Sequence, residues 1–433
     1  MAEKLPFLKG NRVVYEGATS SELSGEHGAE RLANLFQLMQ RGLVYPAPYA
    51  RFVSLWPQPD AKITRAFVGG VAKKVRAAIH ARFGGAHTTA VFGVSFPLYR
   101  SWCEQDKRSV PAGMSYKYPV GSGDQATSKI FRRSYGVFKD SGASLWVHIK
   151  SDDPSHLEGV FKVVLRHLKG QIDRVVFQDC DSRKTRESKD GKVLGCRFSE
   201  NLNNPADPVT LAHHTLVGYE DVEHAGASYV LAQRFTINWE MLHNMTEEQI
   251  EDLIGRTTQD VILPTRDTRT HLNSARQRDD RGNSMFVMRL GLPFGRSRET
   301  KQLAARGGNL RDEEGIYFAG FAKSVRVFET IMNRQIGDWP GFMNDRLFNH
   351  VRSNLGGFFY IPSRADLDFA PESWQGRREK KWSDFPGVSW ERLSRHFRDR
   401  SKNGRMFYNH KNYLYEMSAG AARHRKGRAG IPP

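Results

Sequence analysis

Two similar strand-then-helix segments constrain the fold of this 433-residue chain more than any other feature. The first reads SLWVHIKSDDPSHLEGVFKVVL (residues 144–165), and the second reads GIYFAGFAKSVRVFETIMN (residues 315–333). In each, a short apolar run with strand character is followed by apolar residues at helical spacing. Because one such unit cannot bury its apolar face alone, the repetition indicates a tandem duplication.

The remaining segments continue this alternation in both halves of the chain. Further strands are expected at residues 50–56, 88–94, 174–178, 228–238 and 356–362, and helices at 68–83, 155–168 and 247–254. Strands separated by helices, with too few strands for a doubly wound sheet, predict the α+β class. We expect two tandem ferredoxin-like domains of the dimeric α+β barrel type.

The predicted domain boundaries follow from this scheme. We expect an N-terminal extension at 1–44, a first domain at 45–208, a second domain at 209–372 and a C-terminal extension at 373–433. A helix predicted at 28–41 places Leu32, Leu35, Phe36 and Met39 on one face. That face should pack against the body of the protein or against a neighbouring subunit.

The charge is unevenly distributed. The whole chain carries a formal charge of +18, and residues 374–433 alone hold 15 Lys and Arg against 5 Asp and Glu, a difference of +10. These basic residues alternate with aromatic ones, so the tail could bind nucleic acid. Such tails more often pack their aromatic side chains on the parent domain, and we expect no nucleic-acid partner.

The cysteines and apolar runs bear on location. Cys103, Cys180 and Cys196 show no CxxC spacing, which is typical of a reducing compartment and disfavours a structural zinc site. The first residues, MAEKLPFLKGNRVVYEG, lack the apolar core of a signal peptide, and no run approaches 18 apolar residues. We expect a cytoplasmic protein with no membrane partner.

The stretch at 270–295, THLNSARQRDDRGNSMFVMRLGLPFG, carries the strongest indication of chemistry. Arg289 ends an apolar, strand-like segment at 285–288, where an unpaired guanidinium would cost several kcal/mol. His271 opens the same stretch. A haem would satisfy both residues, because its iron takes a neutral imidazole and its propionates or a bound peroxide can pair with arginine. The alternative is a polar surface pair.

Three motifs in order resemble one known family. Residues 195–208 read GCRFSENLNNPADP, and they are followed by the THL and RLGLPFG segments. Together they resemble the dye-decolourising peroxidases, whose marks are G-F-x-D-G-x-x-N-P, an S/T-H segment and R-x-N-x-P-F-G. Downstream, GIYFAGFAKSVRVFE, NDRL and GGFFYIPS are similar to further segments of that family. The resemblance covers about residues 45–372.

The resemblance implies a role for five residues. His271 matches the axial ligand of the haem iron, and Asp345 matches the carboxylate that bonds that histidine. Arg289 matches the distal arginine, Phe198 matches the phenylalanine of the loop, and Glu200 takes the place of the distal aspartate. A distal carboxylate can move the proton of a peroxide, and an arginine can stabilise the developing negative charge.

The distal loop departs from the family pattern. Both loop glycines are replaced, by Arg197 and Asn201, and the asparagine two places after the arginine is Gly291. Glutamate has nearly the pKa of aspartate but one more methylene, so the loop must retreat to hold Glu200 over the iron. Glu200 could instead pair with Arg197 or cap the loop. Asp345 could likewise be a surface charge paired with Arg346.

Other candidate ligands and electron relays are weaker. His148 alternates with apolar residues in a strand, where a histidine usually points outward or makes one structural hydrogen bond. His213 and His214 should form a surface feature between the halves. Trp339 could relay electrons to large substrates, but a structural role is favoured.

The resemblance implies a haem b peroxidase that reduces hydrogen peroxide and oxidises phenolic or dye-like donors by one-electron steps. One alternative is a haem-binding or haem-handling protein with weak peroxidase activity. A remote alternative is a nucleic-acid-binding protein that acts through its basic tail. We also expect a homo-oligomer. Some members of the family are loaded into encapsulin shells by a C-terminal peptide, but residues 373–433 show no clear loading signature.

Overall fold

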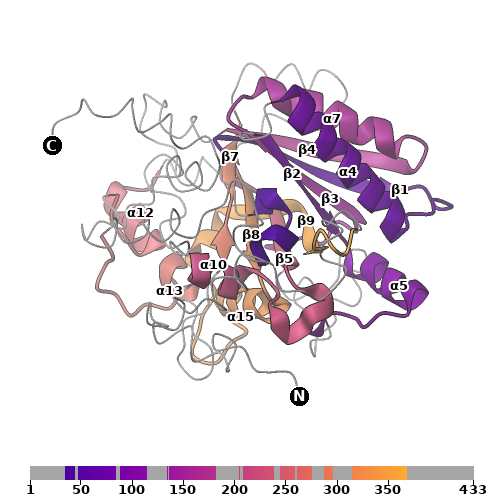
Figure 1. Cartoon of the computed structure of the whole chain (residues 1–433). Helices are drawn as coiled ribbons and strands as arrows, with labels where there is room; N and C mark the ends of the chain where they lie inside the picture. Colours follow the sequence, from indigo (N-terminus) through magenta and orange to yellow (C-terminus); the bar gives the residue numbers. More distant parts are fainter. Residues whose placement is uncertain are drawn as a thin grey trace, which may run out of the picture.

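The first half of the chain forms a four-stranded antiparallel unit with two helices on one face (Figure 1). The computed structural model describes residues 35–43, 47–83, 88–114, 134, 136–181, 204, 208–237, 244–258, 261–275, 287–295 and 315–367. In the first unit the strands lie in the order β4-β1-β3-β2. The elements of this unit are β1 (Tyr49–Pro57), α4 (Arg65–Arg82), β2 (Thr88–Val94), β3 (Leu145–Ser151), α7 (Ser155–Leu168) and β4 (Ile172–Asp181).

The second half repeats this topology. Its strands lie in the order β9-β5-β8-β6, with the short β7 also paired to β8. In both units the fourth strand therefore lies beside the first, followed by the third and the second, which is the ferredoxin-like order. The elements are β5 (Ser228–Ile237), α12 (Glu247–Ile254), α13 (His271–Ala275), β6 (Met288–Arg289), β7 (Leu292–Phe294), β8 (Gly315–Ala322), α15 (Val325–Gln335) and β9 (Val351–Ile361).

The predicted α+β fold with two ferredoxin-like units is confirmed. The two similar segments noted in the sequence are β3 with α7 and β8 with α15, the third strand and second helix of each unit. Shorter elements lie before, within and between the units: η2 (Arg41–Leu43), α5 (Phe96–Asp106), η3 (Ala112–Met114), α10 (Pro208–Thr215), η4 (Tyr219–His224) and η5 (Arg346–Asn349).

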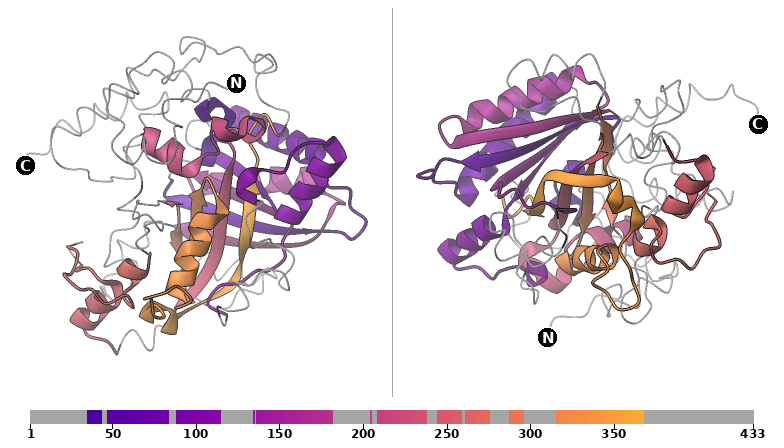
Figure 2. Two further views of the ribbon diagram at one scale, coloured as in Figure 1. Left: turned by 90° about the horizontal axis from the view of Figure 1, so that it is seen from below. Right: turned by 180° about the vertical axis from the view of Figure 1, so that it is seen from behind.

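Apolar side chains form two clusters on opposite faces of the strands. An inner cluster lies where the two units face each other; there Phe52 of β1 stacks on Tyr317 of β8, with ring centroids 3.9 Å apart. An outer cluster lies under the helices, including α4 and α7 on the first unit and α15 on the second. Figure 2 shows the helices of the two units on the outer sides of the strands. Strand alternation therefore decides which side chains face the helices.

Several of the predicted elements differ in extent: β4, predicted at 174–178, spans Ile172–Asp181, and α4, predicted at 68–83, spans Arg65–Arg82. The strand expected at 285–288 is observed as β6, Met288–Arg289, so Arg289 lies within the strand rather than after it. Residues 285 and 286 lie outside the described part of the chain. The last strand begins at Val351, five residues before the predicted start, because its first half pairs with the end of β5 beyond a register shift at Arg234.

The N-terminal residues that the structure describes pack on the body of the protein. Residues 35–38 are helical, and the buried Leu35 and Met39 join the inner cluster, while Phe36 is half-buried against it. The predicted Leu32 lies outside the described residues, as do the whole of 373–433 and the cysteine Cys196. Among the described helices, none has the length and apolar character needed to cross a membrane.

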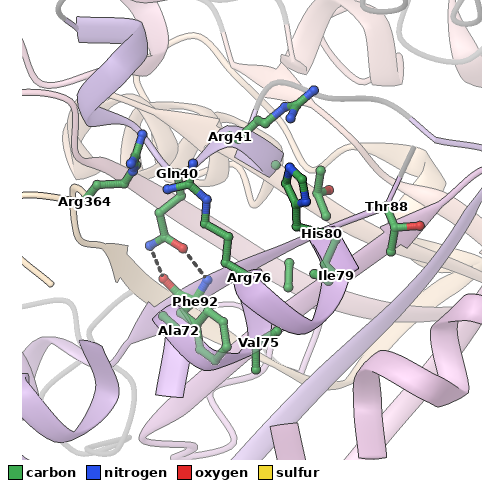
Figure 3. A pocket seen from close by; sticks show the side chains of 13 residues that line it. Gln40, Arg41, Ala72, Val75, Arg76, Ile79, His80, Thr88, Phe92 and Arg364 are labelled. Atoms are coloured by element: carbon green, nitrogen blue, oxygen red, sulfur yellow. Dashed lines mark hydrogen bonds between the residues drawn. The ribbon is translucent and has the colours of Figure 1, made fainter. Parts of the chain in front are cut away.

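The two units meet through very little strand pairing. Where β2 and β9 meet, a position we call the junction, the register contains the single pair Val94 and Tyr360. Gln40 covers the edge of β2 beyond that pair. Its side-chain amide donates to the Phe92 carbonyl (2.8 Å) and accepts from the Phe92 N–H (2.8 Å), as Figure 3 shows, and it also donates to the Pro362 carbonyl (2.9 Å). One buried amide thus takes the place of a neighbouring strand.

A buried ionic cluster lies at the same junction. The Asp366 carboxylate, whose side chain is fully buried, accepts a hydrogen bond from Arg108 Nη2 (2.6 Å) and lies 3.8 Å from His224 Nδ1. Burial opposes protonation of His224, but Asp366 outweighs it and the pKa of His224 is raised. Burial likewise opposes ionisation of Asp366, but His224 and Arg108 together lower its pKa. The contacts in this cluster therefore favour the ionised form of Asp366 and the protonated form of His224.

Candidate functional site

His271 begins a short helix that is held rigidly by its neighbours. The side-chain amide of Asn273 donates to the carbonyls of Thr265 (3.1 Å) and Asp267 (3.0 Å), which fixes the turn before the helix. Gly255 ends α12 with a positive φ of 90°, and a Cβ there would lie 3.1 Å from Leu272 Cβ. This close approach packs the histidine segment against α12, while α13 also packs against α15.

The imidazole of His271 is bonded to a buried carboxylate. Its Nδ1 lies 2.8 Å from Asp345 Oδ2, and the Asp345 side chain is fully buried, whereas 35% of the His271 side chain is exposed. Ser274 Oγ donates to the same carboxylate oxygen (2.7 Å), and the Leu347 N–H donates to the other (2.9 Å). An ionised carboxylate accepts all three bonds, so Nδ1 carries the proton and Nε2 is the nitrogen that can bind a metal.

Asp345 is positioned by backbone bonds on both sides. Its own N–H donates to the Gln335 carbonyl (2.9 Å) at the end of α15, and the Arg346 N–H donates to the Arg269 carbonyl (2.9 Å) just before His271. Asp345 also caps η5 through its bond to Leu347. The segment that carries the carboxylate is therefore attached to the segment that carries the histidine, and the pair can hold its geometry without a ligand.

The alternative role for Asp345, a surface charge paired with Arg346, does not fit its burial. Arg346 instead bonds the exposed carboxylate of Asp252 (2.9 Å). The NDRL segment thus places its aspartate inward, toward His271, and its arginine outward.

Arg289 lies on β6, and its side chain is directed to the face of the strands that the helices cover. Its neighbour Met288 belongs to the inner cluster, and successive strand residues point to opposite faces. The cross-strand partner of Arg289 is Gly320 of β8, so no side chain from that position stands beside the guanidinium. Since α15 covers this face of β8, and α13 packs on α15, Arg289 and His271 belong to the same side of the second unit.

Asn204 anchors the predicted distal loop to Arg289. Its side-chain amide donates to the Arg289 carbonyl (2.7 Å) and accepts from the Arg289 N–H (2.8 Å), and the residue is only 5% exposed. Sequence reasoning assigned Asn204 no structural role of its own. Asn-Pro after a polar loop was the available signal, but nothing in it names a partner 85 residues away.

The other loop residues of the predicted site are not placed. Glu200 and Phe198 lie outside the described residues, together with Arg197 and Asn201. Of the five predicted site residues, the structure therefore brings His271 and Asp345 into contact and puts Arg289 on the same side of the unit. The positions of Glu200 and Phe198 stay predictions.

Two predictions about the rival histidines were wrong. His213 and His214 lie on α10 and are buried, at 7% and 4% exposure, and burial lowers their pKa values to about 2 and about 3. His148 is completely buried and points inward. Its ring centroid lies 4.2 Å from that of Phe52 and 6.5 Å from that of Phe321. Within the described residues, neither of its ring nitrogens has a hydrogen-bond partner. Burial also lowers the pKa of His148.

The described residues contain no group of three or more His, Cys, Asp or Glu that could hold a metal ion. A porphyrin supplies four nitrogen ligands, so the single histidine with its bonded carboxylate fits a haem better than a protein-only metal site.

Comparison with known proteins agrees with this geometry. Residues 196–366, which include Asn204, His271, Arg289 and Asp345, match the family model described as "Dyp-type peroxidase, C-terminal". Over these residues the chain is similar to the DyP-type peroxidases. The dye-decolorizing peroxidase of Mycolicibacterium paratuberculosis is 28% identical over 231 residues, which are 52% of this chain and 60% of that protein.

Further relatives and structures show the same DyP likeness. The dye-decolorizing peroxidase of Mycobacterium tuberculosis is 29% identical over 52% of this chain and 63% of its own length. The chain thus spans about three fifths of the length of these two curated relatives. DyPB from Rhodococcus jostii RHA1 superposes with a TM-score of 0.60 at 24% identity, over 77% of this chain and 98% of that one. The fold is therefore the DyP fold.

Proposed function

We propose that this protein is a haem peroxidase of the dye-decolourising type, which reduces hydrogen peroxide and oxidises phenolic or dye-like donors. The observation that carries the proposal is the 2.8 Å bond between His271 Nδ1 and the buried Asp345 carboxylate. The relatives named above are dye-decolorizing peroxidases, and a DypB from Rhodococcus jostii RHA1 has been solved in complex with heme. Haem b, when bound, would supply an iron that accepts electrons from donors and passes them to peroxide.

His271 would hold the cofactor through Nε2. The bond from Nδ1–H to Asp345 fixes the imidazole plane and raises the basicity of Nε2, because negative charge on the carboxylate favours proton sharing across the bond. Ser274 and the Leu347 N–H hold the carboxylate in place, so Asp345 stays oriented toward His271. These residues would bind the haem and orient the imidazole; they do not touch the substrate.

Arg289 and Glu200 would act on the substrate side. A guanidinium on the helix-covered face of the second unit can stabilise negative charge on a peroxide oxygen. Glu200 would accept the proton from one peroxide oxygen and return it to the other. Phe198 would exclude water next to that carboxylate. Asn204 contributes by fixing the backbone of Arg289 to the loop that carries Glu200.

Further expectations about domains, assembly and location accompany this proposal. We assign residues 45–208 and 209–372 to the two ferredoxin-like domains, flanked by extensions at 1–44 and 373–433. We expect a homo-oligomer, a cytoplasmic location and no nucleic-acid partner. Loading into an encapsulin shell stays a weak expectation for the C-terminal extension.

An absorption spectrum tests the ligand. Protein reconstituted with haemin should show a Soret band, which His271→Ala should shift or abolish. His167→Ala, on α7 of the first unit, is the matched control and should leave the band unchanged. No Soret band in the reconstituted wild type would refute a haem protein, and an unchanged band in His271→Ala would refute the ligand.

A second measurement separates a peroxidase from a haem-binding or haem-handling protein. Glu200→Ala should slow the reaction with peroxide by roughly 10²- to 10⁴-fold if this carboxylate moves the proton. A wild type that binds haem but never reacts rapidly with peroxide would favour the haem-handling alternative. A fast reaction in both proteins would remove Glu200 from the mechanism.

A further inference from the structure

Ser274 follows His271 by one helical turn on α13, and the two side chains bond the same carboxylate oxygen. Ser274 Oγ donates to Asp345 Oδ2 (2.7 Å), and His271 Nδ1 donates to that same atom (2.8 Å). Ser274 is completely buried, so solvent does not compete for its bond. Two donors from one short helix therefore share a single acceptor atom at nearly equal distances.

The position of Asp345 does not rest on Ser274 alone. The backbone N–H of Asp345 donates to the carbonyl of the last residue of α15 (2.9 Å), and its Oδ1 accepts from the Leu347 N–H (2.9 Å). The next residue, Arg346, donates its N–H to the Arg269 carbonyl (2.9 Å). These three bonds hold the carboxylate segment against α15 and the start of α13 without the serine. The Ser274 hydroxyl must therefore matter mainly for the charge on Oδ2.

The Ser274 hydroxyl has a second acceptor within reach, the His271 carbonyl (3.0 Å). A hydroxyl carries one hydrogen, so it donates fully to only one of the two acceptors. The Asp345 oxygen is the nearer acceptor, and hydrogen bonds to a carboxylate are roughly twice as strong as those between neutral groups. The hydrogen of Ser274 therefore points to the carboxylate.

The shared oxygen couples Ser274 to His271. A donor draws negative charge from the oxygen that accepts its bond, so an oxygen with two donors attracts each hydrogen less than an oxygen with one. The Ser274 bond thus weakens the pull of Asp345 Oδ2 on the Nδ1 hydrogen of His271. Because the electron-donating strength of Nε2 rises with that pull, Ser274 and Asp345 act on the imidazole in opposite directions.

We propose that Ser274 is a positioning residue that limits how strongly His271 donates through Nε2, by competing with it for Asp345 Oδ2. The inference rests on the proposed function, in which Nε2 binds the iron of a haem. A weaker axial donor favours the reduced iron. The hydroxyl would therefore keep the reduction potential of a bound haem above the value that His271 and Asp345 alone would give.

NMR spectroscopy of the full chain without haem tests the competition itself. In protein with isotope-labelled histidine, the Nδ1 hydrogen of His271 is assigned by its loss in His271→Ala. Its resonance should move downfield in Ser274→Ala, because its bond to Oδ2 becomes stronger. Ser228→Ala is the matched control, since it removes an equally buried hydroxyl, on β5, that donates to the Thr215 carbonyl (2.7 Å). A resonance that stays in place or moves upfield in Ser274→Ala overturns the proposal.

Spectroelectrochemistry of the haem-loaded protein tests the effect on the iron. Ser274→Ala should lower the reduction potential and raise the Fe–His stretching frequency in resonance Raman spectra, whereas Ser228→Ala should change neither. A serine that only supported the structure would, when removed, loosen His271 and weaken its donation. An unchanged or raised potential in Ser274→Ala therefore overturns the proposal. A failure of the proposed function is distinguishable, because it appears as a missing Soret band in the reconstituted wild type, while the NMR measurement needs no haem.

Discussion

The side-chain amide of Asn204 bonds both the N–H and the carbonyl of Arg289, across 85 residues of sequence. An asparagine amide offers a donor and an acceptor at the spacing of a peptide group, so it pairs with the backbone as a neighbouring strand would. This contact attaches the loop after the first unit to β6 of the second. The position of the Arg289 backbone therefore depends on a residue that touches no substrate.

Asn204→Ala should lower the free energy of unfolding by about 1–3 kcal/mol, because two buried backbone groups lose their partner. Under the proposed function it should also slow the peroxide reaction by more than the stability loss explains, since Arg289 is no longer held. Asn204→Asp keeps the acceptor for the Arg289 N–H but puts an oxygen against its carbonyl, so it should not restore the wild-type rate. Urea denaturation and stopped-flow measurements check both effects; wild-type rates in both variants would contradict the positioning role.

Asp345→Asn keeps the size of the side chain but removes the charge behind His271. With haem bound, the neutral amide should make His271 a weaker donor, so the reduction potential of the iron should rise and haem affinity should fall by about 10- to 100-fold. Spectroelectrochemistry measures the reduction potential, and titration with haemin measures the haem affinity. Asp338→Asn, an exposed carboxylate seven residues earlier, serves as the control. Equal potentials in the two variants would show that Asp345 does not act on the iron through His271.

Two adjacent glycines of α4 should respond oppositely to alanine. A Cβ on Gly69 would lie 2.1 Å from the Leu367 carbonyl oxygen, so Gly69→Ala must push α4 away from the backbone after β9 and should cost several kcal/mol. A Cβ on Gly70 would meet nothing within 4 Å, so Gly70→Ala should stabilise the protein by about 0.5–1 kcal/mol through helix propensity. Thermal denaturation of both variants checks this, and equal shifts would argue against the close approach of α4 and Leu367.

The stability of the protein should depend on pH through the cluster at the junction. The folded-state pKa of His224 is raised above 6.5, so its contribution is fully present below pH 6.5 and is lost as the pH rises through the raised value. The folded-state pKa of Asp366 is lowered below 3.8, so its contribution is present above pH 3.8 and is lost as the pH falls through the lowered value. The free energy of unfolding should therefore fall as the pH rises above 6.5 and fall again as the pH drops below 3.8.

Urea denaturation across this pH range measures both limbs. His224→Gln should be less stable throughout but should lose most of the alkaline fall while keeping the acid one. His167 is a half-buried residue of α7, and His167→Gln should keep both the alkaline and the acid fall in the free energy of unfolding. An unchanged alkaline slope in His224→Gln would contradict the assignment.

The fold was predictable because its signals are local. The alternation of strand and helix patterns in 144–165 and 315–333 gave the repeated unit, and the predicted limits of β2, α7 and α12 agree with the observed ones. The pairing of His271 with Asp345 was predictable for a different reason: both residues lie in short motifs that resemble a family in which they meet. Neither periodicity nor composition alone would have joined positions 74 residues apart.

What the sequence could not show depends on contacts between distant segments. His148 follows the same alternation as an outward strand residue, but the second unit covers that face, so the ring is buried among aromatic side chains. His213 and His214 are buried for the same reason. Gln40 and Asn204 are uncharged amides with no periodic pattern, so only the folded chain reveals that each replaces a strand contact.

Because the chain is synthesised from its N-terminus, the position of Gln40 before β2 matters for the edge of that strand. β9 and Pro362 leave the ribosome more than 250 residues after β2, so the edge of β2 would stay uncovered on a growing chain throughout that interval. Uncovered strand edges recruit other chains. Gln40 is already available when β2 emerges, and its two bonds to Phe92 occupy that edge at once. A single side chain can thus occupy the Phe92 position of this edge before β9 has been made.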